Sequence, residues 1–505
     1  LQRHSFPTRR SSIYYKSTRG NEKLVKSAEA IARGLSEDGG LFVPTLIPKL
    51  TASLEELKEM DYKKLAFTIM KEFLTDYDEK DLIESIDKSY DEKFDTEVIA
   101  PLVKHGETYF LELYHGPTLA FKDMALSILP YLLKNAVKKL NINKEMIILT
   151  ATSGDTGKAA LEGFANVEGT KIIVFFPQEG VSEIQKRQML TQTGDNTFVI
   201  GIEGNFDDAQ NGVKQMLTDD SLLEKLESNN MMFSSANSIN IGRLIPQVVY
   251  YFYAYTQLCN KGEIKVGEEI NFCVPTGNFG NILAGYYAKK MGLPIKKLIC
   301  ASNENKVLFD FINIGTYDRV RDFVITMSPS MDILISSNLE RLLYAISGEN
   351  TSKIKDLMDK LKKDGKYEID DNMKKELKDF FGGYASEEDT AKAITAVYKD
   401  TNYVIDTHTA VAYSVYKKYL EETNDTTKTI IVSTASPYKF TPDVMKSIDS
   451  KYFGLNDFKL IKELSKLTKE DIPVGIKDLE TRPILHKIVC KKNEMQMEIE
   501  KILNI

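Results

Sequence analysis

Two kinds of segment alternate along the chain from about residue 145. Short runs of β-branched and large apolar residues occur at 146–151, 171–176, 196–202, 270–275, 297–300 and 429–434. Amphipathic stretches of helical length lie between several of these runs, at 158–167, 181–192 and 207–217. Nearly continuous apolar strands with helical crossovers are typical of parallel sheets that helices cover on both faces. The pattern therefore predicts an α/β protein.

The same pattern divides the chain into five ranges. Residues 1–12 are basic and contain no acid. We expect them to be a non-native or disordered leader, with a cloning scar favoured over a transit-peptide remnant or an ordinary tail. We expect a helix-rich domain at 13–100, sheet domains at 101–250 and 260–445 (with a charged helical insertion at about 348–400), and a helical tail at 446–505. Ligands of open α/β sheets bind at the carboxyl ends of strands, so the site is expected in a cleft between the two sheet domains.

Composition and charge narrow the range of functions. The chain has 505 residues and a formal net charge of −7, so it lacks the basic excess that nucleic-acid binding requires. Its four cysteines form no CxxC pair and its five histidines are scattered, which predicts a reduced cytoplasmic protein without a metal site. The longest apolar stretch, 244–258, is interrupted by polar residues and is shorter than the roughly 20 residues that span a bilayer. We expect it to form a buried helix and expect no membrane partner.

A glycine-containing turn is the first candidate binding segment. Thr276, Gly277, Asn278, Phe279, Gly280 and Asn281 follow the strand expected at 270–275 and precede a helix expected at 282–291. Such a turn presents unpaired N–H groups and the positive end of the helix dipole to an anion. The segment matches neither a Walker loop nor a GxGxxG motif. A phosphate cradle and an ordinary strand-to-helix turn are therefore both possible interpretations.

A second strand end is rich in hydroxyl groups. The segment 150–157, with the sequence TATSGDTG, contains Thr152, Ser153, Asp155 and Thr156. Hydroxyls and N–H groups in such a turn suit a carboxylate or a phosphate. Helix capping by Ser153, Asp155 or Thr156 is the alternative, because these residue types cap helices routinely.

The segment 115–123, HGPTLAFKD, contains a candidate nucleophile. Gly-Pro marks a turn, and a helix is expected from about Phe121 to Leu140. Lys122 would lie in the first turn of that helix, where the dipole disfavours a cation. We therefore expect a lowered pKa for Lys122 or its neutralisation in a Schiff base. A solvated surface lysine is the alternative, against which the apolar neighbours of Lys122 argue.

Two further segments contribute polar groups. Asn237, Ser238 and Arg243 offer amide, hydroxyl and guanidinium groups, and Arg243 suits bidentate phosphate binding. Thr434 closes the strand at 429–434 with a hydroxyl. A helix cap and a loop are the respective alternatives. A lysine nucleophile, a phosphate cradle and hydroxyl-rich strand ends together indicate pyridoxal 5′-phosphate as the cofactor.

Eight motifs follow one another in an order that we recognise. They are STRG (17–20), SEDGGLFVP (36–44), HGPTLAFKD (115–123), TSGDTG (152–157), NSINIGR (237–243), PTGNFGN (275–281), DTHTAV (406–411) and STASPYKF (433–440). From Tyr14 onward the chain resembles the microbial and fungal branch of the threonine synthases, fold-type II pyridoxal-phosphate enzymes of the tryptophan synthase β superfamily. The resemblance implies two parallel-sheet domains with the cofactor between them.

The resemblance also implies roles for individual residues. Lys122 is similar to the lysine that forms the Schiff base and then moves protons at the substrate carbons. The turn 276–281 matches the cofactor phosphate cradle. Asp155 matches the position that faces the cofactor's 3-hydroxyl, and Thr434 the position that meets its pyridine nitrogen. The substrate-binding positions are Ser153 and Thr156 for the carboxylate, and Thr152, Asn237, Ser238 and Arg243 for the phosphate.

The implied reaction converts O-phospho-L-homoserine and water into L-threonine and phosphate, in a monomer or homodimer. A phospho-lyase that releases 2-oxobutyrate, a serine or threonine dehydratase, and an inert homologue with a binding role are the alternatives. One departure from the family is Ser436, which stands where a histidine is usual, with a bulky Tyr438 nearby. This departure implies a changed pocket shape beside Thr434.

Overall fold

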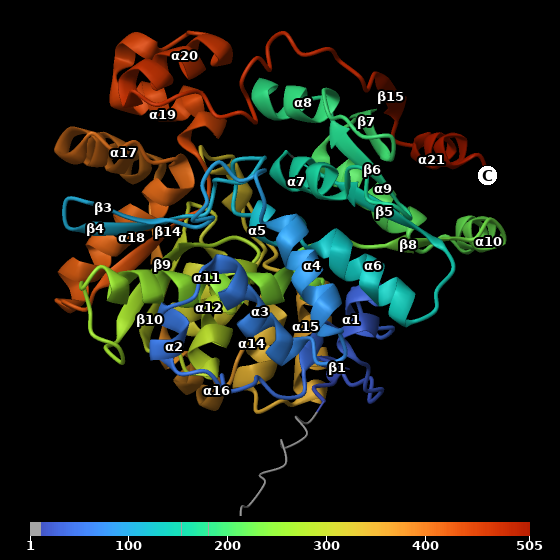
Figure 1. Ribbon diagram of the computed structural model, residues 1–505, viewed down its shortest axis with the longest axis horizontal. Coiled ribbons are helices and arrows are strands. Elements are labelled where there is room, and N and C mark those ends of the chain that lie inside the picture. Colours follow the sequence, from blue (N-terminus) through green and yellow to red (C-terminus); the bar gives the residue numbers. More distant parts are fainter. Residues whose placement is uncertain (1–11, 153, 180) are drawn as a thin grey trace, which may run out of the picture.

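Two parallel sheets form the framework of the protein (Figure 1). The computed structural model describes residues 12–152, 154–179 and 181–505. The larger sheet has the strand order β13 (Phe380–Tyr384), β10 (Ile295–Ser302), β9 (Ile270–Pro275), β14 (Thr429–Ser433), β4 (Thr108–Glu112) and β3 (Leu102–His105). Its neighbours are parallel except for the β3–β4 hairpin. Strands β4, β9 and β14 are buried along their whole length, as the central strands of a covered parallel sheet must be.

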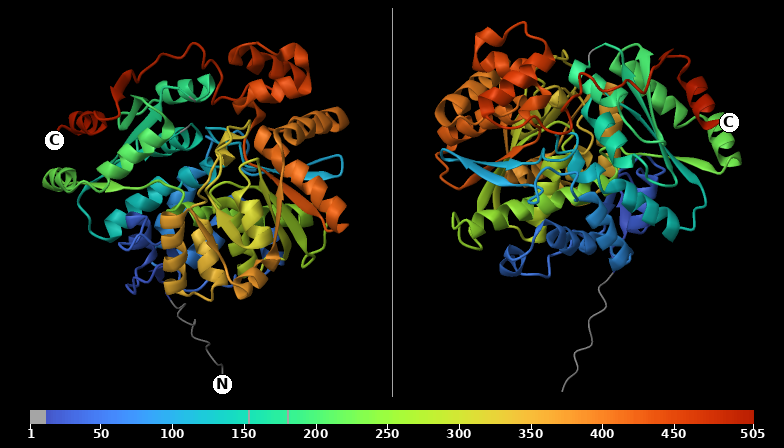
Figure 2. Two further views of the ribbon diagram at one scale, coloured as in Figure 1. Left: turned by 180° about the vertical axis from the view of Figure 1, so that it is seen from behind. Right: turned by 45° about the horizontal axis from the view of Figure 1, so that its top comes forward.

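The smaller sheet is parallel throughout. Its order is β15 (Ile488–Lys491), β7 (Thr197–Glu203), β6 (Thr170–Pro177), β5 (Glu145–Ala151) and β8 (Met231–Ser234). The chain after α20 (Asp457–Thr468) crosses from the larger sheet to the smaller one before it forms β15. All views show this red C-terminal segment beside the green strands of the smaller sheet (Figure 2).

Helices cover the sheets. The N-terminal helices are α1 (Ser27–Arg33), α2 (Leu54–Lys58), α3 (Tyr62–Phe73) and α4 (Glu79–Ser89). Around the smaller sheet lie α5 (Asp123–Leu126), α6 (Leu129–Lys139), α7 (Asp155–Phe164), α8 (Glu183–Leu190), α9 (Phe206–Met216), α10 (Asp220–Ser228) and α21 (Met495–Leu503). The remaining α-helices are α11 (Ile241–Asn260), α12 (Gly280–Met291), α13 (Val307–Ile314), α14 (Leu339–Ile346), α15 (Thr351–Asp364), α16 (Asp371–Glu376), α17 (Glu387–Thr401), α18 (Thr407–Thr423) and α19 (Thr441–Ile448).

Short elements complete the chain. They are the antiparallel pairs β1 (Tyr15–Ser17) with β2 (Phe42–Pro44) and β11 (Thr316–Asp318) with β12 (Lys366–Glu368), and the 3₁₀ turns η1 (Pro329–Met331), η2 (Leu377–Asp379), η3 (Pro437–Lys439) and η4 (Ser450–Tyr452). One continuous hydrophobic cluster includes Ile148 of β5, Leu133 of α6 and Val274 of β9. Both sheets therefore share a core, which fixes their carboxyl ends relative to one another.

The predicted α/β class is confirmed, and each of the six apolar runs forms a strand. The predicted ranges and the sheets do not coincide, because strand pairing joins distant segments. Strands β3 and β4, within 101–250, pair in the larger sheet, and β15, within 446–505, pairs with β7. The stretch 348–400 contributes β13 at the edge of the larger sheet. Residues 1–11 of the expected leader lie outside the described residues.

The helix expected from Phe121 to Leu140 is divided. Helix α5 ends at Leu126, and α6 begins at Leu129 with Pro130 in its first turn. Proline lacks an N–H, and a helix tolerates it best in the first turn. Pro130 therefore starts a new helix and leaves α5 as a single turn, with Lys122 just before it. The buried helix expected at 244–258 forms the middle of α11.

Candidate active site

The segment that precedes Lys122 is held at the end of β14 by two backbone hydrogen bonds. The N–H of Phe121 donates to the carbonyl of Thr434 at 2.8 Å, and the N–H of Ser436 donates to the carbonyl of Leu119 at 3.0 Å. Leu119 adopts a positive φ of 61°, which costs energy for a non-glycine residue and is more frequent at functional sites. These contacts bring the predicted nucleophile and Thr434 together.

Asp155, at the start of α7, faces Lys122 from the smaller sheet. Its Oδ2 lies 3.6 Å from Lys122 Nζ and accepts a hydrogen bond from Ser330 Oγ at 3.0 Å. Its Oδ1 lies 2.7 Å from Lys439 Nζ and accepts from Gln185 Nε2 at 2.9 Å. The site therefore lies between the carboxyl end of β5 and the carboxyl end of β14.

The charges in this cluster shift one another's pKa values. Burial alone would raise the pKa of Asp155, but Lys439 and Lys122 outweigh it and hold that pKa well below its usual range. Burial lowers the pKa of Lys122, whose side chain is 12% exposed. Asp155 opposes this effect, whereas Lys439 and Arg243 add to it. The net result is a lysine amine that loses its proton more readily than a surface lysine does, as the sequence predicted.

The turn 276–281 leads from the end of β9 into the first two residues of α12. Its Phe279 has a φ of 63°, a strained conformation for a residue with a side chain. The Oγ of Ser336 donates to the carbonyl of Gly277 at 2.7 Å, and the side chain of Asn338 donates to the carbonyl of Asn278 at 3.0 Å. The carbonyls of the turn are bound in this way, and the first N–H groups of a helix have no partner within it, so those at the start of α12 are available to an anion.

Asn281 is the first of two orphaned buried groups that fit an anionic ligand. Its Oδ1 accepts hydrogen bonds from Tyr250 at 2.8 Å and Tyr251 at 2.7 Å. Its buried Nδ2 has no hydrogen-bond partner among the described residues. A buried donor without a partner costs free energy, so Nδ2 is suited to a phosphate at the mouth of the turn. We conclude that this cradle fits the phosphate of pyridoxal phosphate.

Arg243, in the first turn of α11, is the second orphaned buried group that fits an anionic ligand. Its NH1 donates to the carbonyl of Ala236 at 3.0 Å, and its buried Nε has no partner within the described part of the chain. Burial lowers the pKa of Arg243 to about 10, which still leaves the guanidinium charged at neutral pH. Asn237 is exposed and Ser238 is half-buried, on the turn that leads into α11. The structure thus places a desolvated cation close enough to lower the pKa of Lys122.

The hydroxyls after β5 are used in different ways. Thr152 Oγ1 accepts from the N–H groups of Gly154 and Gly157, each at 2.9 Å, so it caps α7. Thr156 is half-buried in the first turn of α7. Ser153 lies outside the described residues. Capping was considered for Ser153, Asp155 and Thr156, but the hydroxyl that accepts these N–H groups is that of Thr152. Its hydroxyl hydrogen stays free to donate.

Four residues near Lys122 were missed by sequence reasoning. They are Gln185, Ser330, His408 and Lys439. Ser330 donates its N–H to His408 Nε2 at 3.2 Å, and His408 Nδ1 lies 2.8 Å from Asp406 Oδ2. His408 Nε2 therefore accepts, and its tautomer is set by Asp406. Two of the four lie in motifs that carried the resemblance, His408 in 406–411 and Lys439 in 433–440, but no role was assigned to either.

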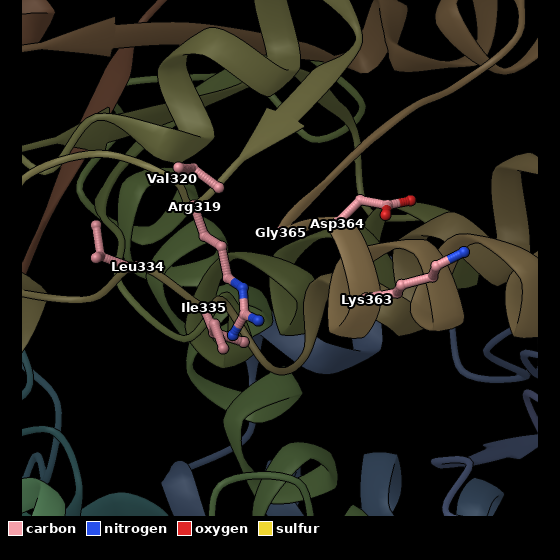
Figure 3. Close-up of a pocket in the computed structure, with 7 residues that line it drawn as sticks. All are labelled: Arg319, Val320, Leu334, Ile335, Lys363, Asp364 and Gly365. Carbon is pink, nitrogen blue, oxygen red and sulfur yellow. The ribbon is translucent and has the colours of Figure 1, made fainter.

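Among the described residues, the structure has one cavity beside the site and a second one away from it. A cavity of about 460 Å³ has Ser436, Tyr438, Glu112, His115 and Glu470 among its lining residues. The departure at Ser436 therefore opens onto an acidic cavity. A depression of about 480 Å³ lies between the end of α15 and the segment after β11 (Figure 3). There the Arg319 guanidinium lies beside Ile335 while Lys363 points away, and none of its lining residues is a predicted site residue.

Two searches of the described residues are relevant to partners. Over 12–152, 154–179 and 181–505, no three His, Cys, Asp or Glu side chains are grouped so that they could hold a metal ion. Within the same ranges, no helix is both long enough and apolar enough to cross a membrane.

The fold and the site define a class of protein. Residues 97–435 match the family described as pyridoxal-phosphate dependent enzyme. Residues 14–90 match the threonine synthase N terminus, and residues 409–489 match the threonine synthase C-terminal family. The cofactor predicted from the residues, pyridoxal 5′-phosphate, is that of the matched class.

Individual relatives narrow the class. The chain is 38% identical to threonine synthase from Pseudomonas aeruginosa, over 86% of this chain and 90% of that protein. It is 35% identical to the crystal structure of pyridoxal-phosphate-bound threonine synthase from Brucella melitensis, with a TM-score of 0.86 and coverage of 98% of this chain and 99% of that one. It is 37% identical to human threonine synthase-like 1 but spans 63% of that protein's length. The chain therefore belongs to the threonine synthase family of pyridoxal-phosphate-dependent enzymes.

Proposed function

We propose that this protein is a lyase that converts O-phospho-L-homoserine and water into L-threonine and phosphate, the last step of threonine biosynthesis. One observation supports a phosphorylated substrate most directly. Arg243 is buried and charged, and its Nε has no partner among the described residues. Its charge also lowers the pKa of Lys122. A charged group is costly to bury unless it is paired, and a phosphate ester would pair it.

We assign the cofactor to Lys122, to the turn 276–281 and to Thr434. The turn would hold the cofactor phosphate through its N–H groups and Asn281 Nδ2. The hydroxyl of Thr434 would meet the ring nitrogen, and Asp155 would face the 3-hydroxyl. When bound, pyridoxal phosphate supplies an electron-withdrawing ring that stabilises negative charge on the substrate carbons.

Lys122 is then the residue that moves protons. Its lowered pKa allows the uncharged amine to accept a proton from the α or β carbon of the substrate and to return it later. Arg243, with Thr152, Asn237 and Ser238, would bind the substrate phosphate and stabilise its charge as it leaves from Cγ. Ser153 and Thr156 would hold the substrate carboxylate and so orient the amino acid over Lys122.

Two alternatives keep the cofactor and change the product. A phospho-lyase would release phosphate and yield 2-oxobutyrate, and the cavity beside Ser436 is the observation that favours it, because the shape of this wall affects where water can add. A serine or threonine dehydratase has no use for the buried Arg243. A third alternative, an inert binding homologue, has no use for a lysine with a lowered pKa.

We further propose a small-molecule substrate, a cytoplasmic location and a monomer or homodimer. The five ranges predicted from the sequence are retained as a proposed division of the chain along its length, with β3, β4 and β15 pairing across that division.

Phosphate release tests the proposal. We expect the purified protein, supplied with pyridoxal phosphate, to release phosphate from O-phospho-L-homoserine and to leave L-serine and L-threonine unchanged. The Lys122→Ala variant should release none, whereas Lys446→Ala, a surface lysine paired with Asp443, should behave as the parent protein does. Deamination of serine or threonine without phosphate release would contradict the proposal and favour the dehydratase.

A further inference from the structure

Lys439 is a second buried lysine at the candidate site. It ends the turn η3, and its side chain is 0% exposed. Its Nζ lies 2.7 Å from Asp155 Oδ1 and donates to the carbonyl of Thr118 at 2.8 Å. These contacts join three segments that are distant in sequence: the loop before Lys122, the start of α7, and the end of the motif after β14.

The contacts of Lys439 determine how Asp155 is oriented. A carboxylate offers about four acceptor positions on its two oxygens. Asp155 uses them for Lys439, Gln185 and Ser330, and Lys122 lies at 3.6 Å. Oδ1 is bound by Lys439 and Gln185, so Oδ2 is the oxygen turned towards Lys122. Since breaking a buried ion pair leaves an uncompensated charge, Lys439 cannot be removed without releasing this arrangement.

The amine of Lys122 is faced by one anion and two cations. The anion is Asp155 of α7, and the cations are Lys439 of η3 and Arg243 of α11. The adjacent carboxyl of Asp123, on α5, has a pKa that burial raises to about 6, and Thr118 binds both of its oxygens. Asp155 is therefore shared between two lysines, and the closer of them is Lys439.

We propose that Lys439 is a positioning residue that holds Asp155 through a buried ion pair and thereby favours the uncharged amine of Lys122, the form able to bond the cofactor. This inference rests on the proposed role of Lys122. Without Lys439, the amine of Lys122 loses a repelling neighbour and becomes the main cation available to Asp155. Both changes favour the protonated amine, which cannot attack an aldehyde.

The uptake of pyridoxal phosphate measures this state directly. The uncharged amine attacks the cofactor aldehyde and water leaves. The uptake rate therefore rises with pH, and the pH at which it is half-maximal, the midpoint, reports the titration of the Lys122 amine. We would free the full chain of cofactor, add pyridoxal phosphate at a series of pH values and follow absorbance. Borohydride reduction and peptide mass spectrometry would confirm that Lys122 is the residue modified.

Lys439→Met keeps the length of the side chain and removes its charge. We expect the midpoint to rise by at least one pH unit, so that uptake below the midpoint slows at least tenfold. Lys446→Met, which removes an exposed lysine paired with Asp443, is the matched control and should leave the midpoint unchanged. An unchanged midpoint in Lys439→Met, with Lys122 modified normally, would overturn the inference and leave the proposed function intact.

A second pair of variants covers the case in which Lys439→Met does not fold. Asp155→Asn leaves Lys439 without an anion and should lower the midpoint, whereas Asp155→Asn with Lys439→Met removes both charges and should raise the midpoint relative to Asp155→Asn alone. A midpoint in Asp155→Asn equal to that of the parent protein would overturn the inference, because the carboxylate that Lys439 holds would then have no effect on the amine of Lys122. Failure of the parent protein to attach the cofactor at Lys122 would instead overturn the proposed function, and the inference with it.

Discussion

The carbonyl oxygen of Ser330 approaches Gly277 so closely that a Cβ added to residue 277 would lie 2.9 Å from it. The same Ser330 donates its hydroxyl to Asp155. Gly277 follows β9 of the larger sheet, and Asp155 follows β5 of the smaller one. Ser330 therefore bridges the two sheets at the site, and glycine at 277 permits the bridge.

We expect Gly277→Ala to displace the segment 329–331. The added methyl group meets a backbone oxygen, and such overpacking typically costs about 1–3 kcal/mol. The variant should unfold at a lower temperature and bind pyridoxal phosphate more weakly. Gly280→Ala is the stability control, because its Cβ would meet only ordinary contacts at 3.5 Å or more. Equal unfolding temperatures for the two variants would contradict this account of Gly277.

Asn281→Asp tests the phosphate cradle. The replacement keeps the acceptor oxygen for Tyr250 and Tyr251 but replaces the orphaned Nδ2 with a carboxylate oxygen. A negative charge facing a phosphate should weaken the binding of pyridoxal phosphate at least tenfold, as measured by equilibrium titration. The cofactor-free protein should unfold at a somewhat lower temperature, because the new carboxylate oxygen is buried without a partner, so affinity is measured at a temperature where the variant is folded. Cofactor affinity equal to that of the parent would place the phosphate elsewhere.

Arg243→Lys tests the substrate phosphate site. Lysine keeps a positive charge but loses the forked guanidinium geometry, and hydrogen bonds to charged groups contribute about 1.5–3 kcal/mol. We expect the KM for O-phospho-L-homoserine to rise about tenfold or more in steady-state phosphate release. Arg33→Lys, on the half-exposed side of α1 near Glu29 and Glu37, is the control. A KM that Arg243→Lys leaves unchanged would remove Arg243 from the site.

The two carboxylates that contact His115 predict that the stability of the fold depends on pH. Its Nδ1 lies 2.5 Å from Asp95 and its Nε2 lies 2.9 Å from Glu112. Burial would lower the pKa of His115, but the two carboxylates outweigh it and raise that pKa to about 9. The folded-state pKa thus exceeds the unfolded value of about 6.5. The charged imidazole therefore stabilises the fold fully below pH 6.5, and this contribution is lost as the pH rises through 9.

Urea unfolding at several pH values would measure this effect. Between about pH 6.5 and 9.5 we expect the free energy of unfolding to fall by about 1–3 kcal/mol. His115→Gln should be less stable than the parent protein at pH 6.5. Its free energy of unfolding should fall much less between pH 6.5 and about 9.5. A variant that declines as steeply as the parent protein would show that other groups cause the pH dependence.

Apolar runs predicted the central strands because a strand covered on both faces is apolar at nearly every position. Strand β13 is not a continuous apolar run, so this rule did not identify it. Its Gly382 and Gly383 interrupt the pattern, and a Cβ on Gly383 would lie 2.5 Å from Val415. Close packing against α18 therefore removes the side chains by which this strand could have been recognised. The pairing of β15 with β7 joins segments almost 300 residues apart, and no local pattern predicts it.

Some residues of the candidate site could be predicted from local sequence patterns, and others could not. The turn 276–281 follows a strand end and Lys122 lies where a helix begins, so local rules apply to both. Gln185 lies 30 residues from Asp155 and Ser330 lies 175 residues from it, so only the folded chain brings them together. Lys439 shares with Lys122 the signal of apolar neighbours. Its role depends on Asp155, however, and that contact is visible only in the structure.

Proton NMR of the purified protein with pyridoxal phosphate and O-phospho-L-homoserine tests the central claim most directly. The account predicts that resonances of L-threonine appear as the substrate disappears, with one phosphate released for each threonine formed, and that Lys122→Ala shows neither. Phosphate released together with 2-oxobutyrate, and no threonine, would contradict it.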